Sequence, residues 1–423
     1  MSRLLRSPLA LMALTVFIDF AGFGLVLPLL PFWAERLGAG PVGVGLIVTV
    51  YALAQMLFTP LLGALSDRYG RRPVILISLL IEALGFALAA LAGSLPLLLV
   101  ARFIGGLGAS NIGSAQAVVS DVTPPEGRAR GMGLIGAAIG LGFVVGPALG
   151  GLLAPLGATL PFWAAMSIAL ANALLVLALL PETRKRGAVS AAEQTSQPQK
   201  FALFAGWHTL RRLPAVTRLV AINLLFTIAF TAMETVFPLF SQRVFGWTAQ
   251  QNGLIFTYVG VIIVVMQGGL VGQLVKRFGE KALLLGGLAL LAVGLALLPF
   301  STTLAALLLA LGLLSVGNGA VSPASSALLS FASPVEAQGE TLGLSQGVGS
   351  LGRIVGPLAA GSFFALGIRL PFLAGAALLL VAALAALPAL PGAPLPSARP
   401  VVYTTTEAQE TAVGEAVGAT PGD

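Results

Sequence analysis

The chain has 423 residues, of which 57% are hydrophobic and only 9% are charged. Because a soluble domain carries about 25% charged residues, this composition excludes a soluble enzyme, a nucleic-acid-binding protein and a disordered chain, in spite of the net charge of +7. The chain has no cysteine and a single histidine, His208, which excludes disulfides, thiolate metal sites and multi-histidine metal sites. The composition predicts a polytopic membrane protein that uses no metal and no cofactor.

Twelve apolar segments are each long enough to cross a bilayer, which takes roughly 20 residues of helix. In chain order these segments cover residues 8–32, 41–65, 74–93, 95–118, 131–154, 159–180, 215–240, 249–274, 281–300, 302–327, 340–366 and 370–390. Their apolar runs are continuous, whereas the strands of a membrane barrel alternate. The sequence therefore predicts an all-α integral membrane protein, with a first segment that is retained rather than cleaved as a signal peptide.

Lysine and arginine are distributed unevenly between the two sides of these segments. With the amino terminus in the cytoplasm, 18 of the 23 basic residues fall on the cytoplasmic side and three, Arg36, Arg243 and Arg369, fall in outer loops. Because short loops rich in Lys and Arg stay in the cytoplasm, we expect both termini there. The basic charge is then a topology signal, and we expect no nucleic-acid partner.

Two motifs occur twice at nearly the same spacing. The segment 63–72, after the second span, corresponds to 272–281 after the eighth, 209 residues later. Gly146-Pro147 in the fifth span corresponds to Gly356-Pro357 in the eleventh, 210 residues later. Two coincident offsets predict two pseudo-symmetric six-helix bundles of equal topology.

The repeat also predicts the division of the chain into parts. We expect a first half, a cytoplasmic linker with an amphipathic helix, a second half and a disordered cytoplasmic tail, over residues 1–181, 182–214, 215–390 and 391–423.

At this point the sequence resembles the major facilitator superfamily, over about residues 8–390. The segment after span 2 matches the family's loop signature through Gly63, Asp67, Arg68, Gly70, Arg71 and Arg72. Span 4 carries the arginine of a further family motif, Arg102. Span 5 carries the glycine-proline motif associated with antiporters, through Gly142, Gly146, Pro147, Gly150 and Gly151. Span 1 around Asp19 is similar to that of tetracycline/proton and other twelve-span drug/proton antiporters. The resemblance implies the major facilitator fold, multidrug efflux with antibiotic resistance rather than enzymatic activity, and the bacterial cytoplasmic (inner) membrane.

The resemblance further implies roles for two of these motifs. Asp67 is expected to act as a conformational latch against the start of span 11 in the outward-facing state, with Arg130 as its side-chain partner. Because glycines allow neighbouring helices to approach closely, we expect the span 5 motif to pack the two halves together. The second loop has Glu280 and Lys281 where the first has Arg71 and Arg72, so a latch there needs different partners.

Five charged residues lie inside predicted spans: Asp19, Glu82, Arg102, Glu234 and Arg353. Each costs roughly 2.5–3.5 kcal/mol at the centre of a membrane helix, so a functionless charge is disfavoured. Asp19 and Arg102 have similar expected depths, and we expect Arg102 to be the counter-charge of Asp19. Glu82 lies on span 3, which is peripheral in the fold, so a structural pairing and a role in proton coupling are both open. The sequence predicts proton coupling through Asp19, Arg102, Glu234 and Glu82.

Aromatic and polar side chains share faces of several spans and mark the predicted substrate cavity. The expected substrate contacts are Phe23, Gln116, Asn223, Phe226, Phe230, Asn318 and Arg353. The aromatic and aliphatic cavity candidates, which are Phe17, Phe23, Phe226, Phe230 and Met233, favour small amphipathic or hydrophobic compounds. No Walker motif is present, and proton binding by a buried carboxylate responds to its surroundings. We therefore expect a drug:H+ antiporter that works by alternating access.

The sequence leaves three other interpretations of the function open. A proton-coupled symporter or exporter of a sugar or other small metabolite would use the same fold, although sugar sites need more hydrogen-bonding groups. An intramembrane enzyme would need a nucleophile and base or a metal cluster, and the carboxylates are scattered over spans 1, 3 and 7. A non-transporting receptor would usually add a soluble domain. The expected partners are a small-molecule substrate, protons and the lipid bilayer, with the chain acting as a monomer.

Overall fold

The computed structural model describes residues 7–124, 127–183, 213–334 and 337–387, and every regular element in this part of the chain is a helix. The first half contains α1 (Pro8–Val26), α2 (Leu30–Arg36), α3 (Pro41–Tyr69), α4 (Arg71–Ala90), α5 (Leu95–Gly108), α6 (Ile112–Val122), α7 (Arg128–Leu153) and α8 (Leu160–Leu179). The second half contains α11 (Pro214–Phe245), α12 (Ala249–Val265), α13 (Val271–Leu297), α14 (Leu304–Ala332), α15 (Gln338–Leu366) and α16 (Leu370–Ala386). The predicted linker helix, His208 and the predicted disordered tail fall in 184–212 and 388–423, outside the described residues.

The described helices form twelve spans. Ten helical stretches are long and apolar enough to cross a membrane, and one of them, Ala249–Phe300, has 52 residues and contains two spans. The chain reverses inside that stretch at Gly279, whose φ is 80°. The shorter apolar helix Leu370–Ala386 completes the set. The predicted all-α architecture with twelve spans is therefore confirmed.

The first span differs from the prediction, which made it continuous over 8–32. The helix ends at Val26 and α2 begins at Leu30. Proline has no backbone N–H and cannot continue a helix at its own position without losing a hydrogen bond. Pro28 falls in this gap, and Pro31 lies in the first turn of α2, where the missing N–H is harmless.

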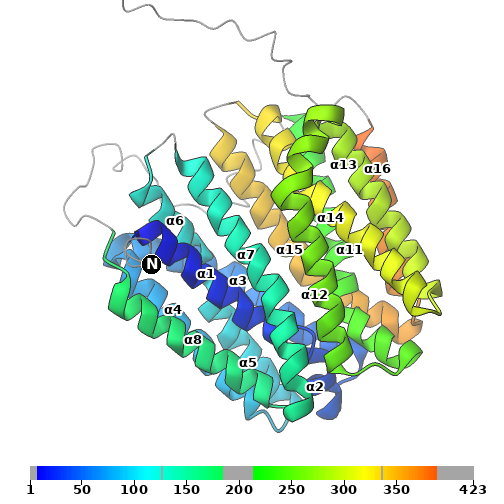
Figure 1. Cartoon of the computed structure of the whole chain (residues 1–423), viewed down its shortest axis with the longest axis horizontal. Coiled ribbons are helices and arrows are strands. Elements are labelled where there is room, and N and C mark those ends of the chain that lie inside the picture. The colour runs from blue at the N-terminus through cyan, green and yellow to red at the C-terminus, as the bar shows by residue number, and fades with distance from the viewer. Residues whose placement is uncertain (1–6, 125–126, 184–212, 335–336, 388–423) are drawn as a thin grey trace, which may run out of the picture.

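The backbone shows the internal duplication that the motifs indicate. Gly70 ends α3 with a φ of 107°, and Gly279 occupies the equivalent place in the second half with a φ of 80°. Both values lie in the region that favours glycine. The two halves form separate bundles beside each other, blue to cyan and green to orange in Figure 1. We call the end of the molecule that carries the turns at Gly70 and Gly279 the basic end, and the opposite end the distal end.

The two halves meet at the distal end through two helix pairs, α3 with α15 and α7 with α12. A methyl group at Gly45 would overlap the carbonyl oxygen of Pro357, and one at Gly253 would lie 2.6 Å from the carbonyl oxygen of Pro147. Pro147 and Pro357 are the prolines of the repeated motif. The duplication therefore places the same glycine-to-proline contact in both helix pairs of the interface.

A second pair of contacts repeats this symmetry one turn further out. A methyl group at Gly361 would overlap the carbonyl oxygen of Pro41, and one at Gly151 would lie 2.9 Å from that of Gln250. Such contacts require glycine because any Cβ would hold the two backbones apart. The hydroxyl of Thr49 adds a hydrogen bond of 2.9 Å to the carbonyl oxygen of Ile354 across the same interface. The distal end is closed by backbone-to-backbone packing.

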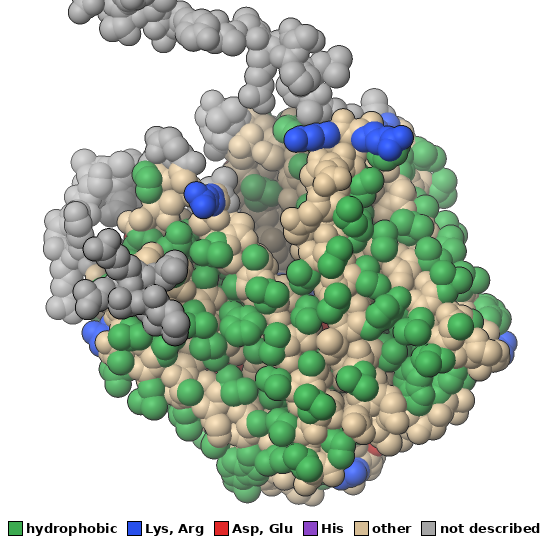
Figure 2. Space-filling view, viewed as in Figure 1, with side chains coloured by type: hydrophobic (Ala, Val, Ile, Leu, Met, Phe, Trp, Pro, Cys, Tyr) green, Lys and Arg blue, Asp and Glu red, His purple; other side chains and the backbone are tan. Residues whose placement is uncertain are grey.

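A hollow opens between the halves toward the basic end, and Lys and Arg side chains stand beside its mouth in Figure 2. The outer faces of both bundles expose many large apolar side chains, among them Leu174 at 64% and Leu384 at 64%. Apolar surface of this kind suits lipid rather than water. The structure thus has a closed distal end, a lipid-compatible perimeter and an open cavity at the basic end.

The distal contact yields a testable prediction. Gly45→Ala and Gly253→Ala should each separate the distal ends, because the added methyl group has no space against a carbonyl oxygen. Since the chain has no native cysteine, spin labels attach only at the introduced residues of the double variant Arg36→Cys and Leu366→Cys. The distance between these two labels measures the separation of the distal ends. Both variants should shift the label distances to longer values.

Gly286→Ala is the matched control, because a methyl group at Gly286 meets no atom within 4 Å among the described residues. It should leave the distances unchanged. Unchanged distances in Gly45→Ala and Gly253→Ala would show that the interface tolerates a side chain there and does not depend on glycine.

Candidate functional site

Two acidic side chains meet in the interior of the first half. Asp19 on α1 and Glu82 on α4 are hydrogen-bonding neighbours, and the side chain of Asn111 is a further partner of Asp19. Glu82 is 1% exposed. Two carboxyl groups can share a hydrogen bond only if one of them carries a proton. The pair is therefore a place where the fold can hold a proton.

Backbone packing of α4 against α5 brings Glu82 to this position. A methyl group at Gly108 would overlap the backbone of Glu82, and one at Gly85 would lie 2.7 Å from Gly105. Glycines on both helices thus let the two backbones touch, which moves α4 inward. Although span 3 is peripheral in the expected fold, the Glu82 side chain reaches the same charge cluster as Asp19, and both a structural pairing and a role in proton coupling remain predictions.

Arg102 on α5 completes the cluster, but in a different way from the prediction. Its guanidinium lies 4.1 Å from the ring centroid of Tyr51 and 6.0 Å from that of Phe23, and these two rings stack 5.2 Å apart. Its nearest acidic influence is Glu82. The expected direct pairing of Arg102 with Asp19 is absent from the described structure, where the arginine contacts aromatic faces instead.

The cluster leaves several polar atoms unused. Within the described residues, Oδ1 of Asp19, Oε2 of Glu82 and Nε of Arg102 are buried and have no hydrogen-bond partner. Buried polar atoms without partners are uncommon and costly. The three groups are therefore set up for more than one arrangement of protons and contacts.

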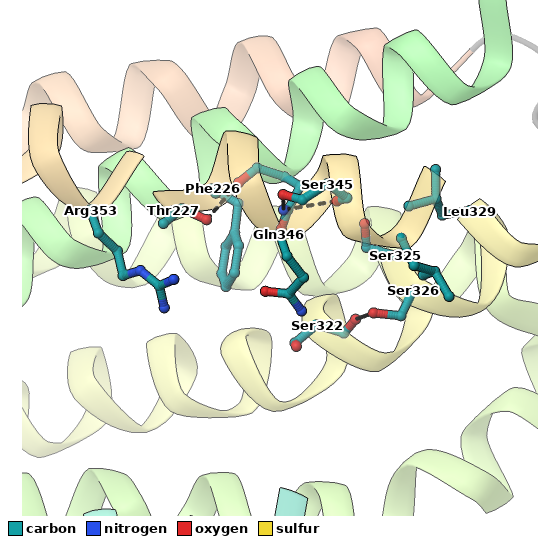
Figure 3. Close-up of a pocket in the computed structure, with 12 residues that line it drawn as sticks. Phe226, Thr227, Ser322, Ser325, Ser326, Leu329, Ser345, Gln346 and Arg353 are labelled. Carbon is teal, nitrogen blue, oxygen red and sulfur yellow. Dashed lines mark hydrogen bonds between the residues drawn. The ribbon is translucent and has the colours of Figure 1, made fainter. Parts of the chain in front are cut away.

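The second half carries its own charge pair beside a pocket. Glu234 on α11 and Arg353 on α15 are electrostatic neighbours, yet no carboxylate oxygen lies within 4 Å of the Arg353 nitrogens in the described part of the chain. The guanidinium donates a hydrogen bond of 3.0 Å to the hydroxyl of Ser350 and is otherwise exposed to the cavity. In Figure 3 the Arg353 side chain points away from its own helix.

The pocket has a volume of about 180 Å³ and is formed by α11, α14 and α15. Its lining is Asn223, Phe226, Thr227, Ser322, Ser325, Ser326, Leu329, Leu342, Ser345, Gln346, Gly349 and Arg353. Hydroxyl and amide groups therefore outnumber the apolar side chains. This part of the cavity is more polar than the aromatic and aliphatic candidates alone indicate.

The predicted substrate residues are distributed over several places. Asn223, Phe226 and Arg353 line the pocket, and Phe230 stacks on Phe226 at 6.2 Å. Phe23 belongs to the Arg102 cluster in the first half. Gln116 is exposed on α6, and Asn318 is buried within α14 away from the pocket lining.

The residues of the loop signature form a charge network at the basic end. Arg71 pairs with Asp67 at 2.6 Å and with Asp121 at 3.1 Å, and it donates a hydrogen bond of 2.8 Å to the Ser66 hydroxyl. Arg68 lies over the ring of Tyr69. Gly63 has open space around its Cα, and Arg130 is exposed. In this conformation the network ties α3, α4 and α6 together within the first half.

Sequence reasoning missed two acidic members of this network, Asp121 and Glu182. The Glu182 carboxylate accepts hydrogen bonds from the backbone N–H groups of Arg71 and Arg72, at 2.9 and 3.3 Å. It thereby satisfies the first free donors of α4 and places negative charge at the positive end of the helix. The Arg72 side chain donates to the carbonyl oxygen of Leu177. The sequence contains a signal for these partners, because Asp121 and Glu182 are acidic residues in loops that are predicted to lie on the basic side of the membrane.

The span 5 glycines have two partners rather than one. Gly142, Gly146 and Gly150 face the backbone of α1 within the first half, where added methyl groups would meet Phe20, Ala21 and Leu25. Only Gly151 of the predicted packing glycines touches the second half. The glycines of the motif therefore mainly join α1 to α7, while Pro147 and Gly151 of the same helix meet Gly253 on α12 of the second half.

The charge network yields a second prediction. Asp67→Asn should lower transport, because the amide no longer pairs with Arg71 and the basic end loses a contact that the latch hypothesis requires for closure. The distal end should then stay closed in a larger fraction of molecules, which the spin-label pair described above measures. Glu35→Gln, which removes a carboxylate from α2 outside this network, is the control and should leave transport and distances unchanged. Normal transport and normal distances in Asp67→Asn would restrict Asp67 to a structural role.

Comparisons with known proteins agree with this architecture. The family model described as "Major Facilitator Superfamily" matches residues 12–279 and 268–415. Multidrug resistance protein 2 of Bacillus subtilis (strain 168) is 32% identical over 361 residues, which cover 85% of this chain and 89% of that protein. Tetracycline resistance protein, class C, of Escherichia coli is 33% identical over 375 residues, which cover 87% of this chain and 93% of that protein.

Solved structures show the same fold. The human organic anion transporter MFSD10 (TETRAN) has a TM-score of 0.67 and 29% identity, and the match covers 90% of this chain and 99% of that one. A bacterial homolog of the human lysosomal transporter Spinster, in an inward-facing and unoccupied conformation, has a TM-score of 0.72 at 17% identity, with 90% of this chain and 96% of that chain covered. The protein is a multi-pass membrane transporter that belongs to the major facilitator superfamily.

Proposed function

We propose that this transporter exports small amphipathic or hydrophobic compounds in exchange for protons, by alternating access. The observation that carries the proposal is the buried carboxyl pair of Asp19 and Glu82 beside Arg102. The similarity to multidrug and tetracycline resistance proteins over most of the chain supports the class of substrate.

The proposed orientation places the basic end and both termini in the cytoplasm. It is supported by the basic side chains at this end, which include Arg68, Arg71, Arg72, Lys276 and Arg277, because such residues remain on the cytoplasmic side. The cavity then opens to the cytoplasm, and the glycine contacts close the outer side. This is the conformation in which an exporter would load its substrate, in the bacterial cytoplasmic membrane, as a monomer surrounded by lipid.

Proton coupling is proposed to work through the carboxyl pair. Two carboxylates in contact within a low-dielectric interior cannot both carry charge without a large energetic cost. The pair therefore holds a proton as long as Asp19 and Glu82 remain together. When α1 moves away from α4, each carboxyl group meets a new environment, and the proton can leave toward the side that has become open.

The fold offers a mechanical route for this coupling. Asp19 lies directly before Phe20 and Ala21, which pack on Gly142 of α7. The distal end of α7 carries Gly151, which touches α12 of the second half. We propose that α7 transmits opening of the distal contact to α1, and thereby to the carboxyl pair.

An alternative function is proton-coupled transport of a sugar or other small metabolite. The polar lining of the pocket, which includes Asn223, Ser322 and Gln346, favours it over a purely hydrophobic site. The direction of transport separates the two functions. In everted vesicles that are acidified inside, an exporter accumulates its substrate, whereas a symporter for uptake does not.

The carboxyl pair gives the third prediction. Asp19→Asn and Glu82→Gln keep the size of each side chain but remove a titrating group, so proton-driven accumulation in everted vesicles should fall to background. The compound used is one to which expressing cells become resistant in a growth screen. Both variants should still insert and fold, as judged by a monodisperse profile in detergent.

A matched control is Glu35→Gln, which removes a carboxylate from α2 outside the cluster and should leave accumulation unchanged. If Asp19→Asn and Glu82→Gln both accumulate substrate at the normal rate, the coupling group lies elsewhere. Glu234 would then be the next residue to test.

The fourth prediction concerns orientation. A reporter that is active only in the cytoplasm should work when fused after residue 195 and should fail when fused at Arg243, because these positions lie on opposite sides in the proposed topology. A periplasmic reporter should give the opposite result at both positions. Reversed activities would place the basic end outside, contrary to the distribution of basic residues.

A further inference from the structure

The guanidinium of Arg353 is a charged group to which the proposed coupling mechanism assigns no role. It lies inside a membrane span, at the wall of the cavity, and its one hydrogen bond within the described residues goes to Ser350. A charged group in a membrane interior is costly unless it is paired or has a function. Arg353 has a carboxylate in its neighbourhood, Glu234, but no ion pair with it within 4 Å in the described part of the chain. The guanidinium therefore keeps most of its donors available.

The surroundings of Arg353 combine hydrogen-bonding groups with an aromatic face. The Gln346 side chain is exposed to the cavity and has no hydrogen-bond partner among the described residues, and Figure 3 shows it pointing toward Ser322 on α14. The ring of Phe226, stacked with Phe230 at 6.2 Å, lies between Gln346 and Arg353. A ligand at this wall meets a fixed positive charge, free amide groups and a flat apolar surface.

Three hydroxyl groups in or beside the pocket already use their protons. Ser326 donates to the carbonyl oxygen of Ser322 at 3.0 Å, Ser350 donates to that of Gln346 at 3.1 Å, and Thr227 donates to that of Asn223 at 2.7 Å. Their lone pairs accept hydrogen bonds but cannot neutralise an anion. The donors that remain for a ligand oxygen are Arg353, the Gln346 amide and three serine hydroxyls that donate to no described residue, those of Ser322, Ser325 and Ser345. Of these donors only the guanidinium carries a positive charge.

We propose that Arg353 is an anion-binding subsite of the substrate cavity, and that the preferred substrates are amphipathic organic compounds that carry a carboxylate. Guanidinium binds carboxylate through two parallel hydrogen bonds, and Phe226 accepts the apolar body of the same molecule. The proposal depends on the proposed function only in taking this cavity as the substrate site.

The position of Arg353 connects such a ligand to alternating access. The next residue, Ile354, accepts the hydrogen bond from Thr49 across the interface of the two halves, and Pro357, one turn further, forms the contact with Gly45. A carboxylate on Arg353 thus lies at the inner edge of the closed distal contact. Separation of α3 from α15 would expose the same ligand to the other side of the membrane.

Glu234 should oppose the binding of an anionic ligand at Arg353. Its charge influences Arg353, so it competes with a substrate carboxylate for the same guanidinium. Removing the Glu234 charge should strengthen binding of an anionic ligand, whereas removing the Arg353 charge should weaken it. Two neighbouring substitutions with opposite effects cannot be explained by general damage to the fold.

The test uses three fluorescent probes with one aromatic body: dansylglycine, which is an anion, dansylglycinamide, which is neutral, and dansylcadaverine, which is a cation. Each is titrated into the full-length protein in detergent, without a proton gradient. Dansylglycine should bind about 10- to 100-fold more tightly than the amide, as expected for a charge-assisted hydrogen-bonded pair. Dansylcadaverine should bind most weakly.

Arg353→Gln should abolish the preference for dansylglycine, Arg353→Lys should restore part of it, and Glu234→Gln should increase it. Arg369→Gln is the matched control, because it removes the same charge from a residue that lies over the Phe300 ring outside the pocket, and it should bind like the wild type. Equal affinities of the wild type for all three probes, no binding of dansylglycine, tightest binding of the cation, or a preference that survives Arg353→Gln would each overturn the proposal.

Binding in detergent is independent of export. Loss of proton-driven accumulation with an intact dansylglycine preference would refute the proposed coupling and leave the anion subsite standing. Normal export with no such preference would refute the anion subsite alone.

Discussion

The contact of helix backbones across the distal end is the constraint on which the remaining structure depends. Membrane helices gain no hydrophobic driving force from one another inside lipid, so close packing has to hold them together. Here glycines on α3, α7, α12 and α15 allow backbone carbonyl groups of one half to touch Cα atoms of the other. The closest contacts of the interface are between backbones, with the Thr49 hydroxyl adding a hydrogen bond to Ile354 across it, so the halves can separate without dismantling either bundle.

The same close packing determines where the charges lie. Gly108 admits the backbone of Glu82, and Gly142 admits Phe20, the neighbour of Asp19. The first half therefore holds two carboxyl groups in hydrogen-bonding contact, with Arg102 turned toward the rings of Tyr51 and Phe23. In the second half, Arg353 faces an open pocket and makes no close ion pair in the described structure. The two halves share an ancestry but present different chemistry: one a proton-holding pair and the other an accessible cation.

This difference suggests a division of labour that we regard as the main functional hypothesis. The carboxyl pair is well suited to protons, because the two groups are hydrogen-bonding neighbours and Glu82 is 1% exposed. The wall formed by α11, α14 and α15 is suited to an organic molecule, because it combines an aromatic ring with a guanidinium and a free amide. The network of Asp67, Arg71, Asp121 and Glu182 lies at the basic end, where it ties α3, α4 and α6 of the first half together.

The sequence alone determined the class, the twelve spans and the duplication. Continuous apolar runs leave no alternative to membrane helices, and two motifs repeated 209 and 210 residues apart give the pseudo-symmetry. It also identified the five charges inside the spans, since a charge in a hydrophobic segment is conspicuous. Only the tertiary structure decided their partners: Glu82 with Asp19, Arg102 with aromatic rings, and Gly146 with α1 rather than with the second half. Helical periodicity gives the face on which a residue lies, but the partner of that face depends on how closely two backbones approach, and that distance is set by glycines on helices remote in sequence.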